Sequence, residues 1–321
     1  MTRLSGWPAL VLTAGLGSRL HPLSLVRAKA ALPIAGEVLI GRILRRLRDS
    51  GIQRVVLNLH HLPETITREV GDGSRFGIRV RYSWESTVLG SAGGPARAIP
   101  LLEADRFLVI NGDTIAEVDL EDLASKHVTT GALVTMAVVA GDPHYGGVVA
   151  DRESVVQGFV PPSLASKGPA PGAPGALGAL GTYHFVGAQA VNASAFSGVS
   201  PDRPMETVRE LYPRLIAQNR GSVRAYSTDV EFLDIGTPGG YLHTASRVAV
   251  REGKPLDCGE RCTLAQDARV ERTILWNDVT VEPHASLTEC IVADGVTVPA
   301  GMSFHRCSLV TLNSKMIAEP F

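Results

Sequence analysis

The chain has 321 residues, of which 45% are hydrophobic and 20% charged, and its formal net charge is −1. It is longer than the size at which one hydrophobic core stops growing, so we expect two domains with full cores. Near-neutral charge argues against nucleic acid or anionic lipid as a partner. No segment approaches the roughly 20 apolar residues of a membrane span or shows the apolar region of a signal peptide, so we expect a cytoplasmic protein.

The first informative element is a glycine turn that follows a short apolar strand at 9–12. It contains Gly15, Gly17 and Arg19, and Lys29 follows ten residues after the arginine. Glycines let backbone N–H groups approach phosphate oxygens, and the two cations supply charge for a bound triphosphate. A dinucleotide fingerprint would need a third glycine, and a Walker loop would need its lysine at the start of a helix. A simple structural turn with a surface arginine is the alternative.

Beyond this turn, apolar residues alternate between helical and strand spacing, which is typical of βαβ architecture. That architecture predicts a parallel sheet with ligands at the carboxyl ends of its strands. The expected elements are a helix at 38–49, strands at 54–59 and 78–82, a short helix at 93–99 and a strand at 107–110.

Two aspartates follow apolar runs at positions far apart in the sequence. Asp113 ends the run that includes Ile110, and Asp234 precedes the glycine turn at Gly236. Mg²⁺ in proteins prefers one or two carboxylates and completes its shell with water and substrate phosphates. Each aspartate alone is more often a turn former or helix cap, but together with the glycine turn they indicate a magnesium site.

The region after residue 255 has a different periodicity. Apolar residues recur at six-residue intervals with single-residue resets, which is typical of a hexapeptide left-handed β-helix of roughly three coils. A compact array of antiparallel hairpins is the alternative. The periodic residues are Leu264 and Val270; Leu275, Val281 and Leu287; and Val292, Val298, Phe304 and Val310.

All four cysteines, Cys258, Cys262, Cys290 and Cys307, fall in this last region. They lack the two close pairs of a zinc knuckle, so reduced thiols are expected.

Four motifs in order resemble those of the sugar-1-phosphate nucleotidylyltransferases, over about residues 8 to 245. They are the glycine turn, a segment from Trp84 to Gly94, Asn111-Gly112-Asp113, and Asp234 to Pro238. The match is most similar to mannose-1-phosphate guanylyltransferases and N-acetylmuramate-1-phosphate uridylyltransferases.

This resemblance implies an α/β fold, a Rossmann-like mixed sheet flanked by helices. A catalytic domain would span residues 1–250 and a small β-helix-like domain residues 256–321, the latter serving oligomerisation or regulation.

The resemblance also implies a reaction in which a sugar 1-phosphate attacks the α-phosphorus of a nucleoside triphosphate and expels pyrophosphate, assisted by Mg²⁺. Positioning and charge neutralisation then provide most of the catalysis. The implied residues are Arg19 and Lys29 for catalysis, Asp113 and Asp234 for the metal, Ala14, Gly15, Gly17, Ser18, Glu85, Gly90 and Ser91 for the nucleotide, and Gly146 and Tyr183 for the sugar.

Glu85 and Gly90 are the residues that bear on the identity of the base. A carboxylate acceptor suits guanine, which offers two adjacent N–H donors, and Gly90 would leave room for the flat base against the backbone. GTP with mannose 1-phosphate is the favoured pair. The same acceptor can meet the N3–H of uracil or thymine, so UTP or dTTP with another sugar, such as N-acetylmuramate 1-phosphate, stays open.

The sugar side departs from the family pattern. Where many relatives have Glu-Lys-Pro, this chain has Gln157 to Pro162, without a lysine. Lys167 is a possible substitute, although a solvated loop lysine is the simpler interpretation. It lies in a Pro/Gly/Ala-rich segment, 161–181, which we interpret as a lid over the sugar.

Two other functional classes deserve comparison. A non-catalytic sensor subunit would keep the fold but typically lose the basic or metal-binding residues, which this chain retains. A dehydrogenase would need the missing third glycine.

Overall fold

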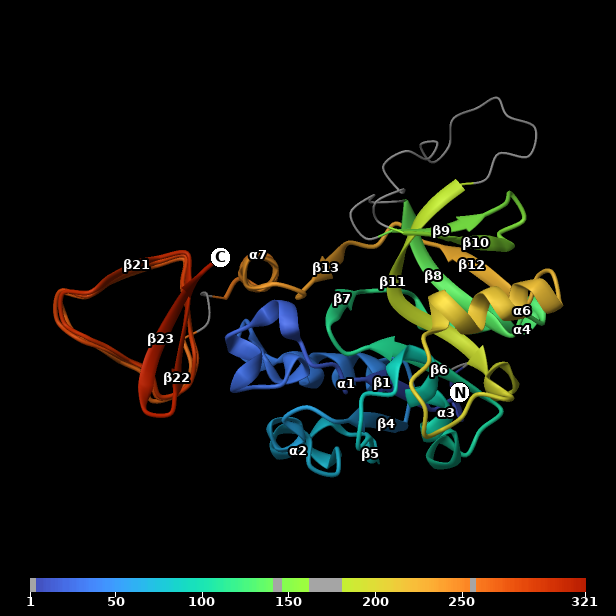
Figure 1. Ribbon diagram of the computed structural model, residues 1–321, viewed down its shortest axis with the longest axis horizontal. Helices are drawn as coiled ribbons and strands as arrows, with labels where there is room; N and C mark the ends of the chain where they lie inside the picture. Colours follow the sequence, from blue (N-terminus) through green and yellow to red (C-terminus); the bar gives the residue numbers. More distant parts are fainter. Residues whose placement is uncertain (1–3, 141–145, 162–180, 255–257) are drawn as a thin grey trace. The chain divides into compact units, whose positions relative to one another are not determined.

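The computed structural model describes residues 4–140, 146–161, 181–254 and 258–321 (Figure 1). Lys167 and the predicted lid, apart from its end residues Pro161 and Gly181, lie outside these ranges. Within the described part, no helix combines the length and apolarity needed to cross a bilayer.

The chain forms two compact units, each described here by itself. Unit 1 contains Met1–Gly15, Leu44–His60 and Gly71–Phe232, and unit 2 contains Leu16–Ile43, His61–Val70 and Leu233–Phe321. The chain therefore passes from one unit to the other inside the glycine turn. Unit 2 joins the C-terminal region to two N-terminal segments. The predicted boundary between a catalytic domain, 1–250, and a C-terminal domain, 256–321, stays a prediction.

Unit 1 is built on a nine-stranded mixed sheet. Its main path runs β10-β9-β11-β6-β1-β4-β5, and β8 pairs with both β11 and β12. β1 is parallel to β4 and β6, as is β4 to β5, whereas β11 is antiparallel to β6, β8 and β9. The strands are β1 (Ala9–Leu12), β4 (Arg54–Leu59), β5 (Arg79–Trp84), β6 (Arg106–Asn111), β8 (Val134–Ala140), β9 (Gly147–Ala150), β10 (Val156–Val160), β11 (Gly181–Asn192) and β12 (Val223–Ser227), with the short β7 (Thr114–Ala116) after β6.

The predicted parallel arrangement is confirmed for β1, β4, β5 and β6, and the mixed sheet for the whole. The central strands β1 and β6 read as continuous apolar runs because both of their faces are covered. Their carboxyl ends deliver Thr13 and Asn111 to one edge of the sheet, since neighbouring parallel strands end on the same side.

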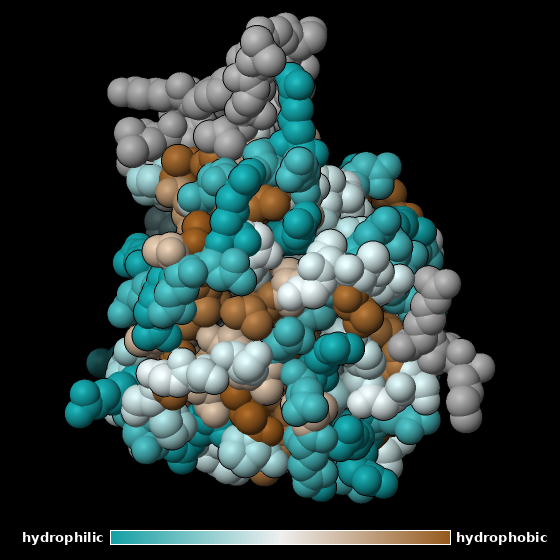
Figure 2. All heavy atoms as spheres, turned by 90° about the vertical axis from the view of Figure 1, so that its right-hand side faces the viewer, coloured by the Kyte–Doolittle hydropathy of each residue, from teal (hydrophilic) through white to brown (hydrophobic). Residues whose placement is uncertain are grey.

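Helices cover both faces of this sheet. α3 (Gly90–Leu102) and α6 (Tyr212–Gln218) contribute Leu102 and Leu215 to the core cluster that contains Val134 and Met136 of β8. α4 (Leu120–Thr130) lies on the other face, because its His127 bonds Thr135, which alternates with those two residues. Figure 2 views the side of the molecule that carries α4 and α6, where apolar residues appear in separate groups between hydrophilic ones.

α4 begins and ends where local chemistry dictates. The Asp119 side chain caps its N-terminus by accepting a hydrogen bond from Asp122 N, and Gly131 ends it in the left-handed conformation. The described part of unit 1 also contains the short helical turns η4 (Ser74–Phe76), η6 (Ala193–Phe196) and the π-helical η7 (Thr207–Leu211).

His127 in α4 is a buried titratable group of the core. Its ring nitrogens lie 2.9 Å from Thr135 Oγ1 and 3.1 Å from Asn192 Oδ1, and its ring meets that of Trp7 edge-on. Burial lowers the pKa of His127 below its usual value, because a charged imidazolium would lose its hydration.

We expect the stability of the protein to fall as the pH drops below about 6.5, the unfolded-state pKa of histidine, because the unfolded chain then binds the proton more readily than His127 does in the fold. Thermal unfolding measured between pH 8 and 5 should show this slope in the wild type and a smaller one in His127→Gln. The exposed His243 provides the control, and an equal reduction in His243→Gln would assign the slope elsewhere.

Unit 2 begins with three short 3-10 turns, η1 (Ser18–Leu20), η2 (Leu23–Leu25) and η3 (Lys29–Ala31). The hairpin of β2 (Pro33–Ile34) and β3 (Glu37–Val38) follows, and α1 (Leu39–Asp49) leads into unit 1. α2 (Pro63–Val70) and α7 (Pro238–Arg251) are its other helices, and β13 (Phe232–Asp234) is the strand through which the chain returns from unit 1.

The C-terminal region is a coil of short parallel strands, which confirms the β-helix prediction; its handedness stays a prediction. Three ladders repeat every 17 residues, so that Thr263 pairs with Thr280 and Thr280 with Thr297. The ladders are β14 (Thr263–Leu264), β17 (Thr280–Val281) and β20 (Thr297–Val298); β15 (Arg269–Glu271), β18 (Ser286–Thr288) and β21 (Ser303–His305); and β16 (Ile274–Leu275), β19 (Ile291–Val292) and β22 (Cys307–Leu312), the last paired with antiparallel β23 (Lys315–Pro320).

Three sides of six residues would give a coil of 18 residues, but each coil here has 17. One side is therefore one residue short, which explains the single-residue resets in the six-residue pattern. The 17-residue repeat also corrects one position. Leu309, not the predicted Val310, continues the ladder of Leu275 and Val292. Leu264 in the first coil is 44% exposed because no preceding coil covers it.

One corner of the coil is occupied by a stack of charged residues in the left-handed conformation. Arg272, Glu289 and Arg306 have φ of 44°, 54° and 51° and are successive equivalents in the repeat. Arg272 and Arg306 each form an ion pair with Glu289, at 3.0 and 3.2 Å. The alternation of charge lets non-glycine residues stack at a position that glycine usually fills.

Within unit 2, the coil is joined to α7 and the N-terminal turns by a buried tryptophan. Trp276 Nε1 donates to Tyr241 Oη at 3.1 Å, and that hydroxyl donates to the Pro33 carbonyl at 2.6 Å. Arg27 lies over the Trp276 ring and pairs with Asp294 at 2.5 Å. The turn that carries Lys29 is thereby supported by the coil.

Candidate functional site

A cavity of about 290 Å³ opens at the carboxyl ends of β1, β4 and β6 in unit 1. It brings together six residues that the sequence placed in the nucleotide and metal sites, from segments spread over a hundred residues. Its lining is Leu12, Ala14, Gly15, Asn58, Glu85, Val88, Gly90, Ser91, Asn111, Asp113 and Glu206.

The floor of this cavity is organised by Asn58, a residue that the sequence analysis missed. Its side-chain carbonyl accepts a hydrogen bond from Thr13 N at 2.7 Å, and its amide donates to Glu85 Oε1 at 2.7 Å. Thr13 Oγ1 donates to the Asn58 carbonyl at 2.5 Å. Asn58 therefore fixes the start of the glycine turn relative to the Glu85 segment. Its position at the end of a buried strand was the available signal.

Glu85 has both carboxylate oxygens engaged inside the protein. Oε1 accepts from Asn58, and Oε2 accepts from Leu89 N at 2.9 Å. The side chain is only 5% exposed. Glu85 thus holds the loop before α3. A base bound by Glu85, as predicted, would share its two carboxylate oxygens with Asn58 and Leu89 N.

The protein's own packing gives a further reason for a glycine at position 90, besides its predicted place beside a base. Its φ is +75°, and a Cβ there would lie 2.7 Å from both Glu206 Oε1 and the Met205 carbonyl. Protein fills the space in that direction, but Gly90 itself lines the cavity, so its place beside a base stays a prediction. Glu206 Oε2 accepts a hydrogen bond from Ser91 Oγ at 2.6 Å, so the 205–207 segment closes one side of the cavity.

Unit 2 holds the remaining charged residues of the predicted site, together with Gly17 and the exposed Ser18. A Cβ on Gly236 would lie 2.5 Å from Asp234 Oδ2 and 3.0 Å from Arg19 Nη2, so these two side chains flank one glycine. Gly17, with φ of +63°, packs against Ser24, which donates to its carbonyl at 2.8 Å, and lies close to Lys29 Cβ.

The donor set fits magnesium better than a metal bound mainly by protein. Among the described residues, no three His, Cys, Asp or Glu side chains gather in a way that could hold an ion. Asp113 lines the cavity together with Asn111. The four cysteines of the C-terminal region, which are all described, are free thiols, as expected. One or two carboxylates, with water and substrate phosphates, are the environment that Mg²⁺ adopts.

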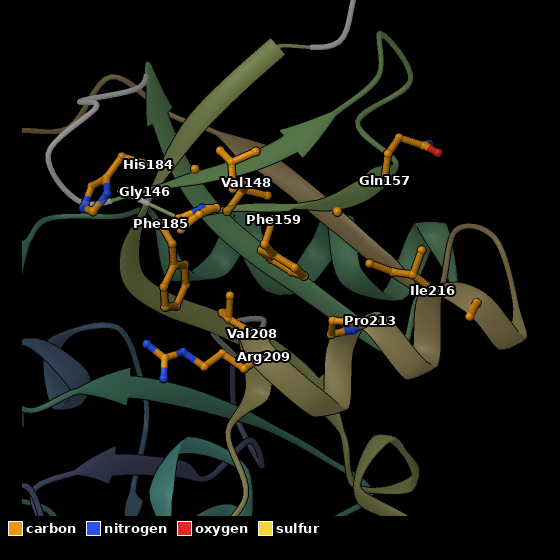
Figure 3. A pocket seen from close by; sticks show the side chains of 15 residues that line it. Gly146, Val148, Gln157, Phe159, His184, Phe185, Val208, Arg209, Pro213 and Ile216 are labelled. Atoms are coloured by element: carbon orange, nitrogen blue, oxygen red, sulfur yellow. The ribbon is translucent and has the colours of Figure 1, made fainter. Parts of the chain in front are cut away.

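A second cavity in unit 1, of about 800 Å³, lies between β9, β10, β11 and the η7–α6 segment (Figure 3). Of the two predicted sugar-binding residues, Gly146 lines it, whereas Tyr183 is not among the lining residues and packs against the core cluster. Its neighbours on β11, His184 and Phe185, line the cavity instead. The walls are mostly apolar, and Gln157, His184 and Arg209 supply the polar side chains.

Asn58 offers a direct test of the cavity floor. Asn58→Asp keeps the size but replaces a donor to Glu85 by a second carboxylate, so we expect a loss of about 1–3 kcal/mol in the free energy of unfolding and weaker nucleotide binding. Urea unfolding and calorimetric titration measure the two effects. Asn219→Asp, at an exposed asparagine, is the control, and equal values for both variants would contradict the role of Asn58.

Comparison with known proteins agrees with this geometry. A family model described as Nucleotidyl transferase matches residues 8–250. Mannose-1-phosphate guanylyltransferase of Mycobacterium tuberculosis is 29% identical over 310 residues, which cover 93% of this chain and 83% of that protein. N-acetylmuramate alpha-1-phosphate uridylyltransferase of Neisseria meningitidis is 42% identical over 112 residues, or 35% of this chain and 48% of that protein.

Among solved structures, HddC from Yersinia pseudotuberculosis, complexed with GMP-PN, has a TM-score of 0.61 at 24% sequence identity. The alignment covers 75% of this chain and 99% of HddC. At this identity the similarity confirms the predicted fold.

Proposed function

Because the chain belongs to the nucleotidyl transferase family, as its motifs predicted, we propose that it transfers a nucleoside monophosphate from a nucleoside triphosphate to a sugar 1-phosphate. GTP and mannose 1-phosphate are the favoured substrates, and a nucleotide sugar and pyrophosphate are the products. The observation that carries this proposal is the cavity in which Ala14, Gly15, Glu85, Gly90, Ser91 and Asp113 meet.

In the proposed reaction a phosphate oxygen of the sugar 1-phosphate forms a bond to the α-phosphorus, and the bond to the β-phosphate oxygen breaks. Backbone N–H groups from Ala14 to Ser18 hold the triphosphate, because glycines there keep side chains out of the way. Arg19 and Lys29 neutralise the charge that develops on the leaving pyrophosphate and at the transferring centre.

Asp113 and Asp234 are the residues that would hold Mg²⁺. When bound, the ion would neutralise triphosphate charge and orient the phosphates. The two carboxylates belong to unit 1 and unit 2 respectively, so the proposal requires both units to serve the same triphosphate.

A UTP-dependent transferase for N-acetylmuramate 1-phosphate is the second candidate. Two observations favour it: the 42% identity to the Neisseria protein over 112 residues, and the apolar walls of the larger cavity, which suit a sugar with apolar substituents better than one with hydroxyls alone.

The deciding experiment measures pyrophosphate release with each of four nucleoside triphosphates and the 1-phosphates of mannose, glucose, N-acetylmuramate and heptose. We expect GTP with mannose 1-phosphate to give the highest kcat/KM. A maximum with UTP and N-acetylmuramate 1-phosphate would select the second candidate, and no release with any pair would overturn both.

The metal assignment predicts that Asp113→Ala or Asp234→Ala abolishes turnover at any practical Mg²⁺ concentration, because the triphosphate loses a ligand for its bridging cation. Asp105, an exposed residue at the opposite end of the strand that leads to Asp113, is the matched control. Steady-state rates in both variants equal to that of Asp105→Ala would rule out the metal site.

For Lys29 we expect the alanine variant to lose turnover more than nucleotide affinity, because the lysine acts mainly on charge that develops during the reaction. Comparing kcat with the Kd for the triphosphate separates the two effects. A loss confined to Kd would reassign Lys29 to ground-state binding.

A further inference from the structure

The acceptor of the proposed reaction carries a phosphate with two negative charges, and the family's lysine for it is missing from the 157–162 segment. We propose that Arg209 binds this phosphate and thereby positions the attacking oxygen. The proposal rests on the proposed function, since it names the ligand of the acceptor substrate at the same site.

Arg209 is the one lysine or arginine among the described residues that line the larger cavity. Figure 3 shows its side chain extending from the segment before α6 toward the part of the cavity that Phe185 lines. Gly146, predicted to contact the sugar, lines the same cavity. A sugar bound there would have one cationic side chain within the described walls to meet its phosphate.

The segment that carries Arg209 borders both cavities. Glu206 lines the smaller cavity, and Val208 and Arg209 line the larger one, so four consecutive residues, 206–209, border both spaces. The transferred group has to pass from a triphosphate in the first cavity to an acceptor in the second. A cation on the dividing segment is therefore placed where the acceptor phosphate must lie.

The backbone of this segment is firmly held. Thr207 N donates to Ser91 Oγ at 2.8 Å, and Glu206 N donates to Glu210 Oε1 at 3.0 Å. Leu211 and Tyr212 are fully buried, and the Tyr212 hydroxyl donates to Gln189 Oε1 at 2.6 Å. The segment is a π-helical turn, a rare conformation that is frequent at functional sites.

The guanidinium itself makes no hydrogen bond or ion pair with any described residue, unlike those of Arg42, Arg46 and Arg97, which bond carboxylates or carbonyls. A fixed backbone with an uncommitted guanidinium is preorganised for an external anion. The planar fork of arginine matches phosphate with two parallel N–H···O bonds.

The experiment compares Arg209→Ala and Arg209→Lys with the wild type, using the substrate pair that the panel selects. We expect Arg209→Ala to raise KM for the sugar 1-phosphate about 10- to 100-fold, the range for a hydrogen bond to a charged group, with KM for the triphosphate changed less than about twofold. Arg209→Lys should recover part of the loss, because it keeps the charge without the fork.

Two matched variants sharpen the result. Arg214→Ala removes an exposed arginine of α6 that lines neither cavity and should behave as the wild type. Arg203→Ala removes an exposed arginine upstream of the segment that also lines neither cavity. A rise in KM for the sugar 1-phosphate in Arg203→Ala but not in Arg209→Ala would overturn the assignment, as would equal rises in both KM values for Arg209→Ala.

Calorimetric binding of mannose 1-phosphate and N-acetylmuramate 1-phosphate keeps the test independent of turnover. If no substrate pair reacts, the proposed function fails, but a weaker affinity in Arg209→Ala than in Arg214→Ala still supports the phosphate site. Equal affinities in these two variants, or no binding by the wild type, would overturn it.

Discussion

The smaller cavity depends on one buried amide. Asn58 is the penultimate residue of β4, which lies between β1 and β5. Its side-chain oxygen faces Thr13 N and its side-chain nitrogen faces Glu85. An amide side chain can accept from a backbone N–H through its oxygen and donate to a carboxylate through its nitrogen at the same time. Because all three residues are less than 10% exposed, each lost partner would leave a polar group without water to replace it.

Two acidic residues around the cavity have structural roles. Glu85 is a structural anchor for the loop before α3, and Glu206 takes the exposed position beside Gly90 and Ser91. Two carboxylates from segments 121 residues apart thus shape one wall, and the segment of Glu206 continues directly into that of Arg209. The segment that closes one side of the smaller cavity also carries a cation that lines the larger one.

The C-terminal coil takes part in the organisation of unit 2. Trp276 and Asp294 of the coil hold Arg27, and Tyr241 connects the same tryptophan to Pro33. These contacts bracket the turn of Lys29 on both sides. The coil therefore supports the turn that carries Lys29, through buried aromatic packing and one ion pair.

The sequence by itself determined the βαβ order and the six-residue period of the C-terminal region. It also determined the two strand ends that are followed by the glycine turn and by Asp113. All of these are local patterns of apolar spacing and of glycine at turns. It could not reveal the partners of Asn58, nor that Glu206 and Arg209 line the two cavities. Their roles come from strands and turns that meet only when the sheet forms. The 17-residue repeat, which places Leu309 rather than Val310 in the ladder of Val292, was likewise decided by tertiary packing, as were the contacts of Glu206 beside Gly90. One residue of register or one neighbouring carboxylate leaves no trace in local sequence.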